Sequence, residues 1–127
     1  MLFWRMNRAA RIIVSLKFQL GQMTPDEMVE FMVNRVGHEK FGATSEVRRF
    51  ISAAPLYQVG YLIGGRQLLA LHDEMVGAGK VTEQQFNDAV LAENAMPIEL
   101  LRAALEKLPL ARDTQPSWKF AGEKIPE

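Results

Sequence analysis

The sequence predicts an all-α protein, with about six helices in an irregular bundle over residues 1–108 and an extended tail over residues 109–127. Apolar residues recur at helical spacing along most of the chain, and capping-box sequences at Thr24 and Thr82 precede two of these segments. No segment alternates apolar and polar residues as a half-buried strand does. A chain of 127 residues is long enough for one domain and too short for two.

The first helix is expected from about Phe3 to Leu20, with Gly21 ending it. Its apolar residues cover much more than one stripe; they are Phe3, Trp4, Met6, Ile12, Ile13, Val14, Leu16 and Phe18. A helix that is apolar nearly all round is normally buried on most sides. In so small a domain this predicts a missing neighbour, so we expect either a second copy of the chain or an absent N-terminal region to pack on this helix.

Local stop and start residues predict the next three helices. Thr24 caps a helix that runs to Gly37, and a third helix spans about Ala43 to Ser52. A fourth begins at Pro55, whose fixed φ suits a first turn, and runs to about Val76.

Three glycines lie inside the fourth predicted helix, at positions 60, 64 and 65. Each costs up to about 1 kcal/mol relative to alanine, and such a cost usually has a packing reason. Gly60 and Gly64 are four residues apart, so we expect helix one or a partner to pack closely on that face.

The last two predicted helices follow the same rules. Thr82 and Gln85 form a capping box for a fifth helix to about Ala92, and Met96-Pro97 starts a sixth that ends near Leu108. The tail contains three of the six prolines and few periodic apolar positions, and we expect Trp118 and Phe120 to pin it to the helices.

Composition narrows the classes of function. The 15 basic and 15 acidic residues balance, which gives no support to a nucleic-acid or acidic-membrane partner. The chain has no cysteine, which excludes disulfides and thiolate metal sites and fits a cytoplasmic location. Cations interrupt the apolar segment 2–20, so it fails the tests for a membrane span and for a secretory signal.

The two histidines do not form a zinc-binding sequence. His38 and Glu39 begin the pattern HExxH, but position 42 is glycine; four residues after His72 the chain has Val76. No serine lies in a Gly-x-Ser-x-Gly context, and no glycine loop is followed by Lys-Ser or Lys-Thr. The residues alone therefore predict neither a metal site nor a nucleophile.

A series of residues carries a family resemblance. In the middle of the chain these are Glu46, Val47, Arg49, Phe50, Pro55, Tyr61 and Gly64, where Phe50 replaces the family's tyrosine. On either side they are Arg8, Arg11, Met23, Thr24 and Glu27, then Phe86, Asn87, Asp88, Leu91, Met96 and Pro97. In order and spacing they resemble the C-terminal helical part of the bacterial domain-of-unknown-function 885 family, over roughly residues 5–105.

The resemblance implies a zincin-like fold, since that family looks like helical HExxH metallopeptidases. It implies that this portion supplies the substrate-facing wall, with Arg8, Arg11 and Arg49 binding substrate and Tyr61 acting in catalysis. An arginine fork suits a peptide carboxylate, and a tyrosine hydroxyl suits an oxyanion. Zinc would be expected only if an upstream region carries the HExxH motif.

The residues also allow structural interpretations. The arginines are often ion-pair partners on and between helices, with Glu46 an obvious acid, and Tyr61 would then be a packed tyrosine bonded to backbone. At three positions where the family usually carries an ionisable residue, this chain has Ser15, Gln19 and Asn87, which cannot exchange protons near neutral pH. They mark either relaxed catalysis or tolerated structural changes.

The leading hypothesis is therefore a helical binding or assembly module that has no catalysis of its own. The alternative is half of a metallopeptidase active site, completed by an upstream region or by another chain.

Overall fold

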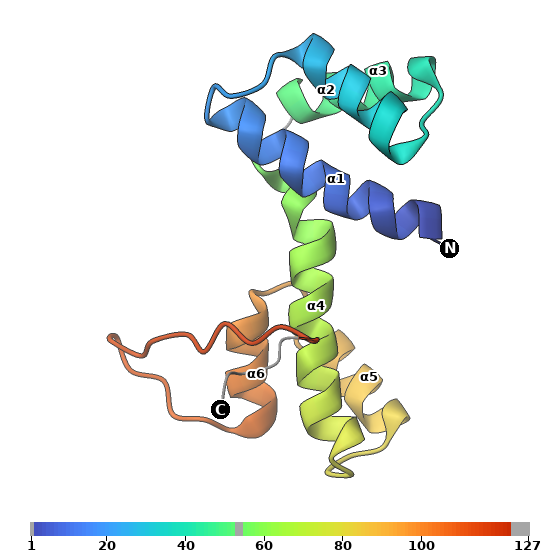
Figure 1. The fold of residues 1–127 in the computed structure, drawn as a ribbon. Coiled ribbons are helices and arrows are strands. Elements are labelled where there is room, and N and C mark those ends of the chain that lie inside the picture. The colour runs from blue at the N-terminus through green and yellow to red at the C-terminus, as the bar shows by residue number, and fades with distance from the viewer. Residues whose placement is uncertain (1, 53–54, 123–127) are drawn as a thin grey trace. The chain divides into compact units, whose positions relative to one another are not determined.

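The structure, a computed structural model, describes residues 2–52 and 55–122, and within them the chain forms six α-helices and no strand. The all-α class predicted from the sequence is confirmed. The chain divides into two compact units, Met1–Leu62 and Ile63–Glu127. Figure 1 shows their helices. The helical domain expected over residues 1–108 stays a prediction.

The first unit is built from α1 (Leu2–Gln19), α2 (Pro25–Phe31) and α3 (Lys40–Ser52). The predicted capping box starts α2: Thr24 Oγ1 accepts the Glu27 N–H at 3.3 Å, and the Thr24 N–H donates to the Glu27 carboxylate at 2.7 Å. A π-helical turn, Met32–Val36, extends α2.

Three helices meet in the core of the first unit, where α2 contacts both α1 and α3 (Figure 1). The buried apolar residues recur at helical spacing on the inner face of each helix. They are Ala10, Val14, Met28, Met32, Val36, Ala43, Val47 and Phe50.

Within the described residues helix α1 is buried on one side, and burial of its other sides by the expected neighbour stays a prediction. It buries only Asn7, Ala10, Val14 and Ser15, while several large apolar side chains are exposed. The reason is geometric, because the elements that pack on α1 within this unit cover one of its sides. Its predicted boundaries are correct to within a residue or two.

The start of the fourth helix is also corrected. Leu56 has a left-handed backbone with φ of 61°, which an α-helix does not accommodate, and a 3-10 turn at Tyr57–Val59 follows before α4 (Gly60–His72) begins. A Cβ at Gly60 would meet no side chain and no other element of the first unit within 4 Å, so α1 does not pack closely there. Close packing of a partner on the glycines stays a prediction.

The second unit contains most of α4 together with α5 (Glu83–Ala92) and α6 (Ile98–Glu106). A π-helical turn, Asp73–Gly77, extends α4 to about the predicted end. The Thr82 capping box and the α6 start after Pro97 are as predicted. The buried core residues are Leu71, Met75, Phe86 and Leu101.

The tail after α6 forms no helix or strand as far as residue 122, and several polar contacts tie it to the helices. Ser117 donates twice to Glu99, Lys119 pairs with Glu74 at 2.9 Å, and Arg66 donates to the Ala121 carbonyl. Trp118 is 59% exposed and so does not pin the tail as expected, whereas Phe120 is partly buried. The predicted tail's last five residues, 123–127, lie outside the described residues.

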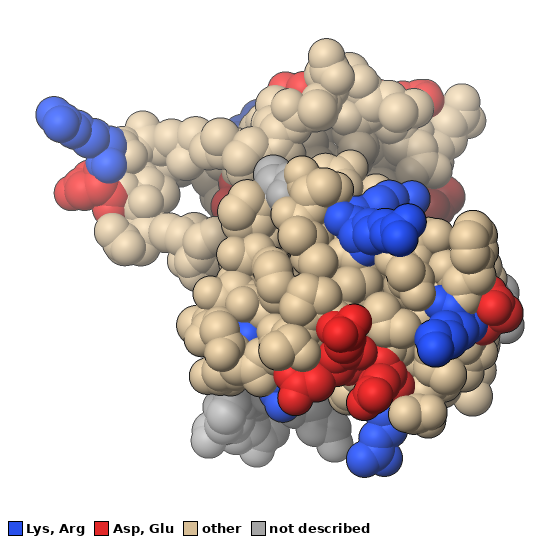
Figure 2. Space-filling view, turned by 90° about the horizontal axis from the view of Figure 1, so that it is seen from above, with Lys and Arg blue, Asp and Glu red and all other residues tan. Residues whose placement is uncertain are grey.

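No described helix is both long and apolar enough to cross a bilayer. On the face seen in Figure 2, acidic and basic side chains lie in small groups with uncharged atoms between them.

Candidate functional site

An open hollow of about 400 Å³ lies in the first unit, where α1, α3, the 3-10 turn and the start of α4 come together. We call it the arginine–tyrosine hollow. Its lining residues are Arg11, Arg49, Ser52, Tyr57, Gln58 and Tyr61. Three of the four site residues implied by the resemblance are therefore neighbours in space.

One carboxylate organises the two arginines of the hollow. Arg11 Nη2 donates to Glu46 Oε2 at 2.8 Å, and Arg49 donates to Glu46 Oε1 from one turn further along α3. The Arg11 and Glu46 side chains are 13% and 15% exposed, whereas that of Arg49 is 62% exposed. With two cations and one anion, the cluster keeps one formal positive charge, and Arg49 presents most of it to solvent.

Two tyrosine hydroxyls complete the polar side of the hollow. The Tyr57 and Tyr61 hydroxyl oxygens are 3.3 Å apart and hydrogen-bonded, and their rings meet edge to face. The Arg11 guanidinium carbon lies 5.5 Å from the centre of the Tyr61 ring, within cation–π range. The hydrogen bond to Tyr61 raises the pKa of Tyr57, so this hydroxyl is a neutral donor at neutral pH.

The remaining sequence-predicted residues lie elsewhere. Arg8 is exposed on α1 and does not line the hollow. Ser15 is buried in α1 and Gln19 is exposed at its end, while Asn87 is exposed on α5 in the second unit. The structure therefore groups Arg11, Arg49 and Tyr61 without Arg8.

Both sequence interpretations of the arginines describe part of what is observed. Arg11 and Arg49 pair with Glu46 as the structural interpretation expected, and they also line an open hollow. Tyr61 is 52% exposed and bonds a hydroxyl rather than backbone, so the packed-tyrosine interpretation is wrong.

Sequence reasoning missed three lining residues. Ser52 and Tyr57 are exposed on the hollow, and Gln58 is buried with a side-chain oxygen that has no hydrogen-bond partner among the described residues. Tyr57 could have been found, because it precedes Tyr61 by four residues and such pairs share a helical face.

The chemistry available in the arginine–tyrosine hollow is anion binding. Guanidinium N–H groups and phenol O–H groups are all donors, and Glu46, the one carboxylate bonded to them in the described part of the chain, already accepts from both arginines. Both carboxylate oxygens of Glu46 are already bonded to arginines, so this group is not placed to take a proton from a ligand. The site is suited to hold a carboxylate rather than to move a proton.

The described residues do not form a metal-binding group of histidine and acidic side chains at this hollow. In the ranges 2–52 and 55–122, no three His, Asp or Glu side chains lie close enough to hold a metal ion together. His38 Nε2 is 2.8 Å from Asn7 Oδ1, and His72 Nε2 is 2.8 Å from Glu83 Oε2. The expectation of no cofactor in this chain stays a prediction.

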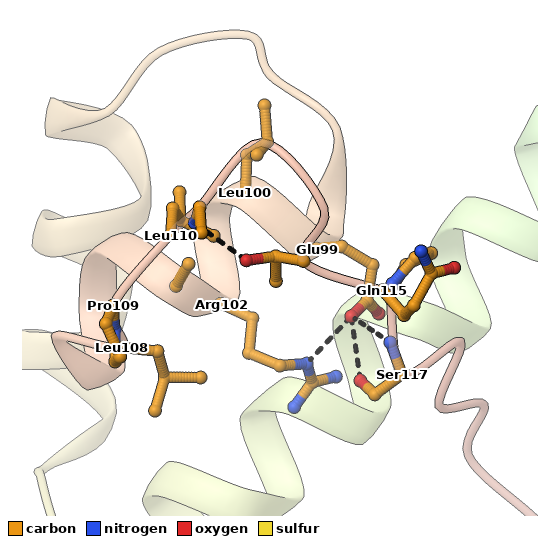
Figure 3. A pocket seen from close by; sticks show the side chains of 12 residues that line it. Glu99, Leu100, Arg102, Leu108, Pro109, Leu110, Gln115 and Ser117 are labelled. Atoms are coloured by element: carbon orange, nitrogen blue, oxygen red, sulfur yellow. Dashed lines mark hydrogen bonds and ion pairs between the residues drawn. The ribbon is translucent and has the colours of Figure 1, made fainter.

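A second hollow, of about 340 Å³, lies in the other unit between α6 and the tail (Figure 3). Leu100, Leu108 and Leu110 contribute apolar lining. Its arginine, Arg102, has a side chain that is 3% exposed and pairs with Glu74, and burial lowers its pKa. This hollow offers mainly apolar surface, and the charge of its arginine is paired with Glu74.

The model of a family described as bacterial protein of unknown function (DUF885) matches residues 1–105. The chain belongs to this family. DUF885 membership confirms the family predicted from the residues, while its zincin-like fold and the assignment to its C-terminal part stay predictions. The matched range includes every residue of the arginine–tyrosine hollow. A search of curated proteins and a search of solved structures gave no match.

Proposed function

We propose that this DUF885 chain is a non-catalytic helical module that binds a peptide carboxylate in the arginine–tyrosine hollow. It corresponds to the substrate-wall portion of a zinc metallopeptidase-like protein and lacks the HExxH metal site. The observation that supports this function is the convergence of Arg11, Arg49 and Tyr61 on one open hollow.

Arg49 is the first contact for the ligand. Its guanidinium is largely exposed and donates to Glu46, so it has further N–H groups that can donate to a second carboxylate without losing the first. An arginine fork gives a carboxylate two parallel hydrogen bonds, and the exposed Tyr61 hydroxyl adds a neutral donor beside it. The surplus positive charge of the cluster favours an anion over a neutral amide.

The alternative function is half of a metallopeptidase active site, completed by an upstream region or by another chain. The half-exposed Tyr61 hydroxyl favours it, because a neutral donor at a hollow can face an oxyanion when a metal-bearing region lies opposite. Under this alternative, zinc would be held by the other region, and Arg11 and Arg49 would hold substrate.

Calorimetric titration with short peptides tests the binding function. A peptide with a free C-terminus should bind, and its C-terminally amidated form should bind roughly tenfold more weakly because one charge-assisted contact is lost. Arg49→Gln should remove that preference. Arg48→Gln is the matched control, since Arg48 is exposed beside it on α3 and does not line the hollow.

Equal binding of the free and amidated peptides would contradict the carboxylate site. A peptidase assay with added zinc tests the absence of catalysis, and zinc-dependent hydrolysis by the purified chain would refute a non-catalytic module. Tyr61→Phe then separates the two functions, because it should weaken binding slightly in a module and abolish turnover in an active site.

A further inference from the structure

Helix α1 has an outer apolar stripe opposite its buried face. Six residues form it: Leu2, Met6, Ala9, Ile13, Leu16 and Leu20. All six are exposed, from 38% for Met6 to 72% for Leu2 among the large side chains. We call this stripe the outer seam. Leu20 follows the last residue of α1, and its N–H still donates to the Leu16 carbonyl in helical register.

The spacing of the outer seam is that of a coiled coil. Successive members are four, three, four, three and four residues apart, which is the a/d repeat that one helix presents to another. A strict a/d stripe is narrower than the face with which a helix covers a globular core. The outer seam is thus shaped for a single partner helix lying along about 27 Å of α1, at a rise of 1.5 Å per residue.

Charge on α1 narrows the choice of partner. Arg5 and Lys17 lie at positions that flank the seam, Arg8 is exposed one turn from Arg5, and α1 contains no acidic residue. In coiled coils the residues flanking the seam set the choice of partner through ion pairs. A partner helix that carries Asp or Glu at its own flanking positions complements these cations.

We propose that the outer seam of α1 docks an amphipathic helix of another protein, with apolar residues at its seam and acidic residues on both flanks. A second copy of this chain fits less well, because self-pairing would bring a second set of the same cations to the seam. An anionic membrane also fits less well. Interfacial helices bury a broad apolar face, and Trp4, the aromatic residue typical of such faces, lies off the narrow seam.

The test uses the full chain and two synthetic peptides of three heptads. Both have leucine at the seam positions; one has glutamate at the flanking positions and the other has lysine. Fluorescence anisotropy should show that the glutamate peptide binds roughly tenfold more tightly than the lysine peptide, with the difference shrinking at high salt.

Two variants locate the contact. Ile13→Asp places a charge at the middle of the seam and should reduce affinity for the glutamate peptide at least tenfold; Leu91→Asp, at an exposed leucine of α5, is the matched control. The double variant Arg5→Glu with Lys17→Glu changes only exposed side chains and should reverse the preference toward the lysine peptide.

Three results would overturn the proposal. Equal binding of the two peptides would show that charge does not select the partner. Concentration-dependent dimerisation in sedimentation equilibrium, abolished by Ile13→Asp, would show that a second copy occupies the seam. Binding to phosphatidylglycerol vesicles but to neither peptide would assign the seam to a membrane surface.

Discussion

Each unit contains a carboxylate that pairs with two cations, and the two clusters differ in what surrounds them. Glu46 of the first unit pairs with Arg11 and Arg49. Glu74 of the second pairs with Arg102 and Lys119. The first cluster opens on the arginine–tyrosine hollow with Arg49 exposed, whereas Arg102 is almost fully buried.

The two clusters also differ in charge balance, because the second cluster contains a second acid. Glu99 Oε2 lies 3.7 Å from Arg102 Nε and accepts from Ser117, so the second cluster has two anions for two cations (Figure 3). The first cluster has one anion for two cations. The comparison teaches that surplus charge and exposure, rather than the presence of an arginine–glutamate pair, distinguish a binding cluster from a structural one.

The largest loss of stability is expected from replacing Arg102, the buried arginine of the second cluster. Arg102→Met leaves Glu74 and Glu99 without their shared cation and should lower the free energy of unfolding by about 2–3 kcal/mol. Lys119 remains beside Glu74, which keeps the loss below that of a fully isolated buried charge. Urea unfolding measures it, with Arg112→Met on the exposed tail as control; equal stability of the two variants would refute a structural role.

A smaller loss of stability is expected from replacing Arg11 in the first unit. Arg11→Met removes the link from α1 to Glu46 but leaves Arg49 on the same carboxylate, so the free energy of unfolding should fall by about 1–2 kcal/mol. The same urea titration applies. A loss as large as that of Arg102→Met would mean that the two clusters do not differ as described.

Arg49 should separate binding from stability. Because its side chain is largely exposed and its ion pair is local, Arg49→Gln should change the free energy of unfolding by less than about 0.5 kcal/mol. The peptide affinity should fall nevertheless. A stability loss above 1 kcal/mol would make Arg49 a structural residue like Arg102.

The smallest expected effect is a dependence of stability on pH, which arises from His72 in the second unit. The hydrogen bond to Glu83 raises the pKa of His72 above its usual value. Its contribution to stability should be complete below about pH 6.5, the pKa in the unfolded chain, and should disappear as the pH rises through the higher folded pKa. Melting temperatures across this range should show the decline, and Glu83→Gln should flatten it.

Local sequence signals predicted most of the helices. The capping boxes at Thr24 and Thr82 are formed as expected because their partners lie three residues away in the chain. The predicted start of α4 was wrong because Leu56 has a left-handed backbone. Glycine or asparagine usually adopts that conformation, so a leucine gives no sequence signal for it. The apolar composition of α1 predicts a neighbour, but it does not say which side of the helix that neighbour covers.

The site was predictable only in part. Family resemblance grouped Arg11, Arg49 and Tyr61 together with Arg8, which does not line the hollow. The residues themselves suggested Glu46 as the acid for the arginines. The pairing of Arg102 with Glu74 was missed because 28 residues separate them, and no periodic pattern connects side chains at such a distance. Gln58 was not assigned to the site, because its burial depends on tertiary packing.

The contact between Arg66 and the Ala121 carbonyl bears on how the second unit folds. Its partners are 55 residues apart, so forming it early would close a long loop before the helices compensate for the lost chain entropy. We therefore expect it to be absent from the folding transition state. Arg66→Gln should then leave the refolding rate nearly unchanged and speed unfolding, which makes this tail contact a determinant of how long the unit stays folded.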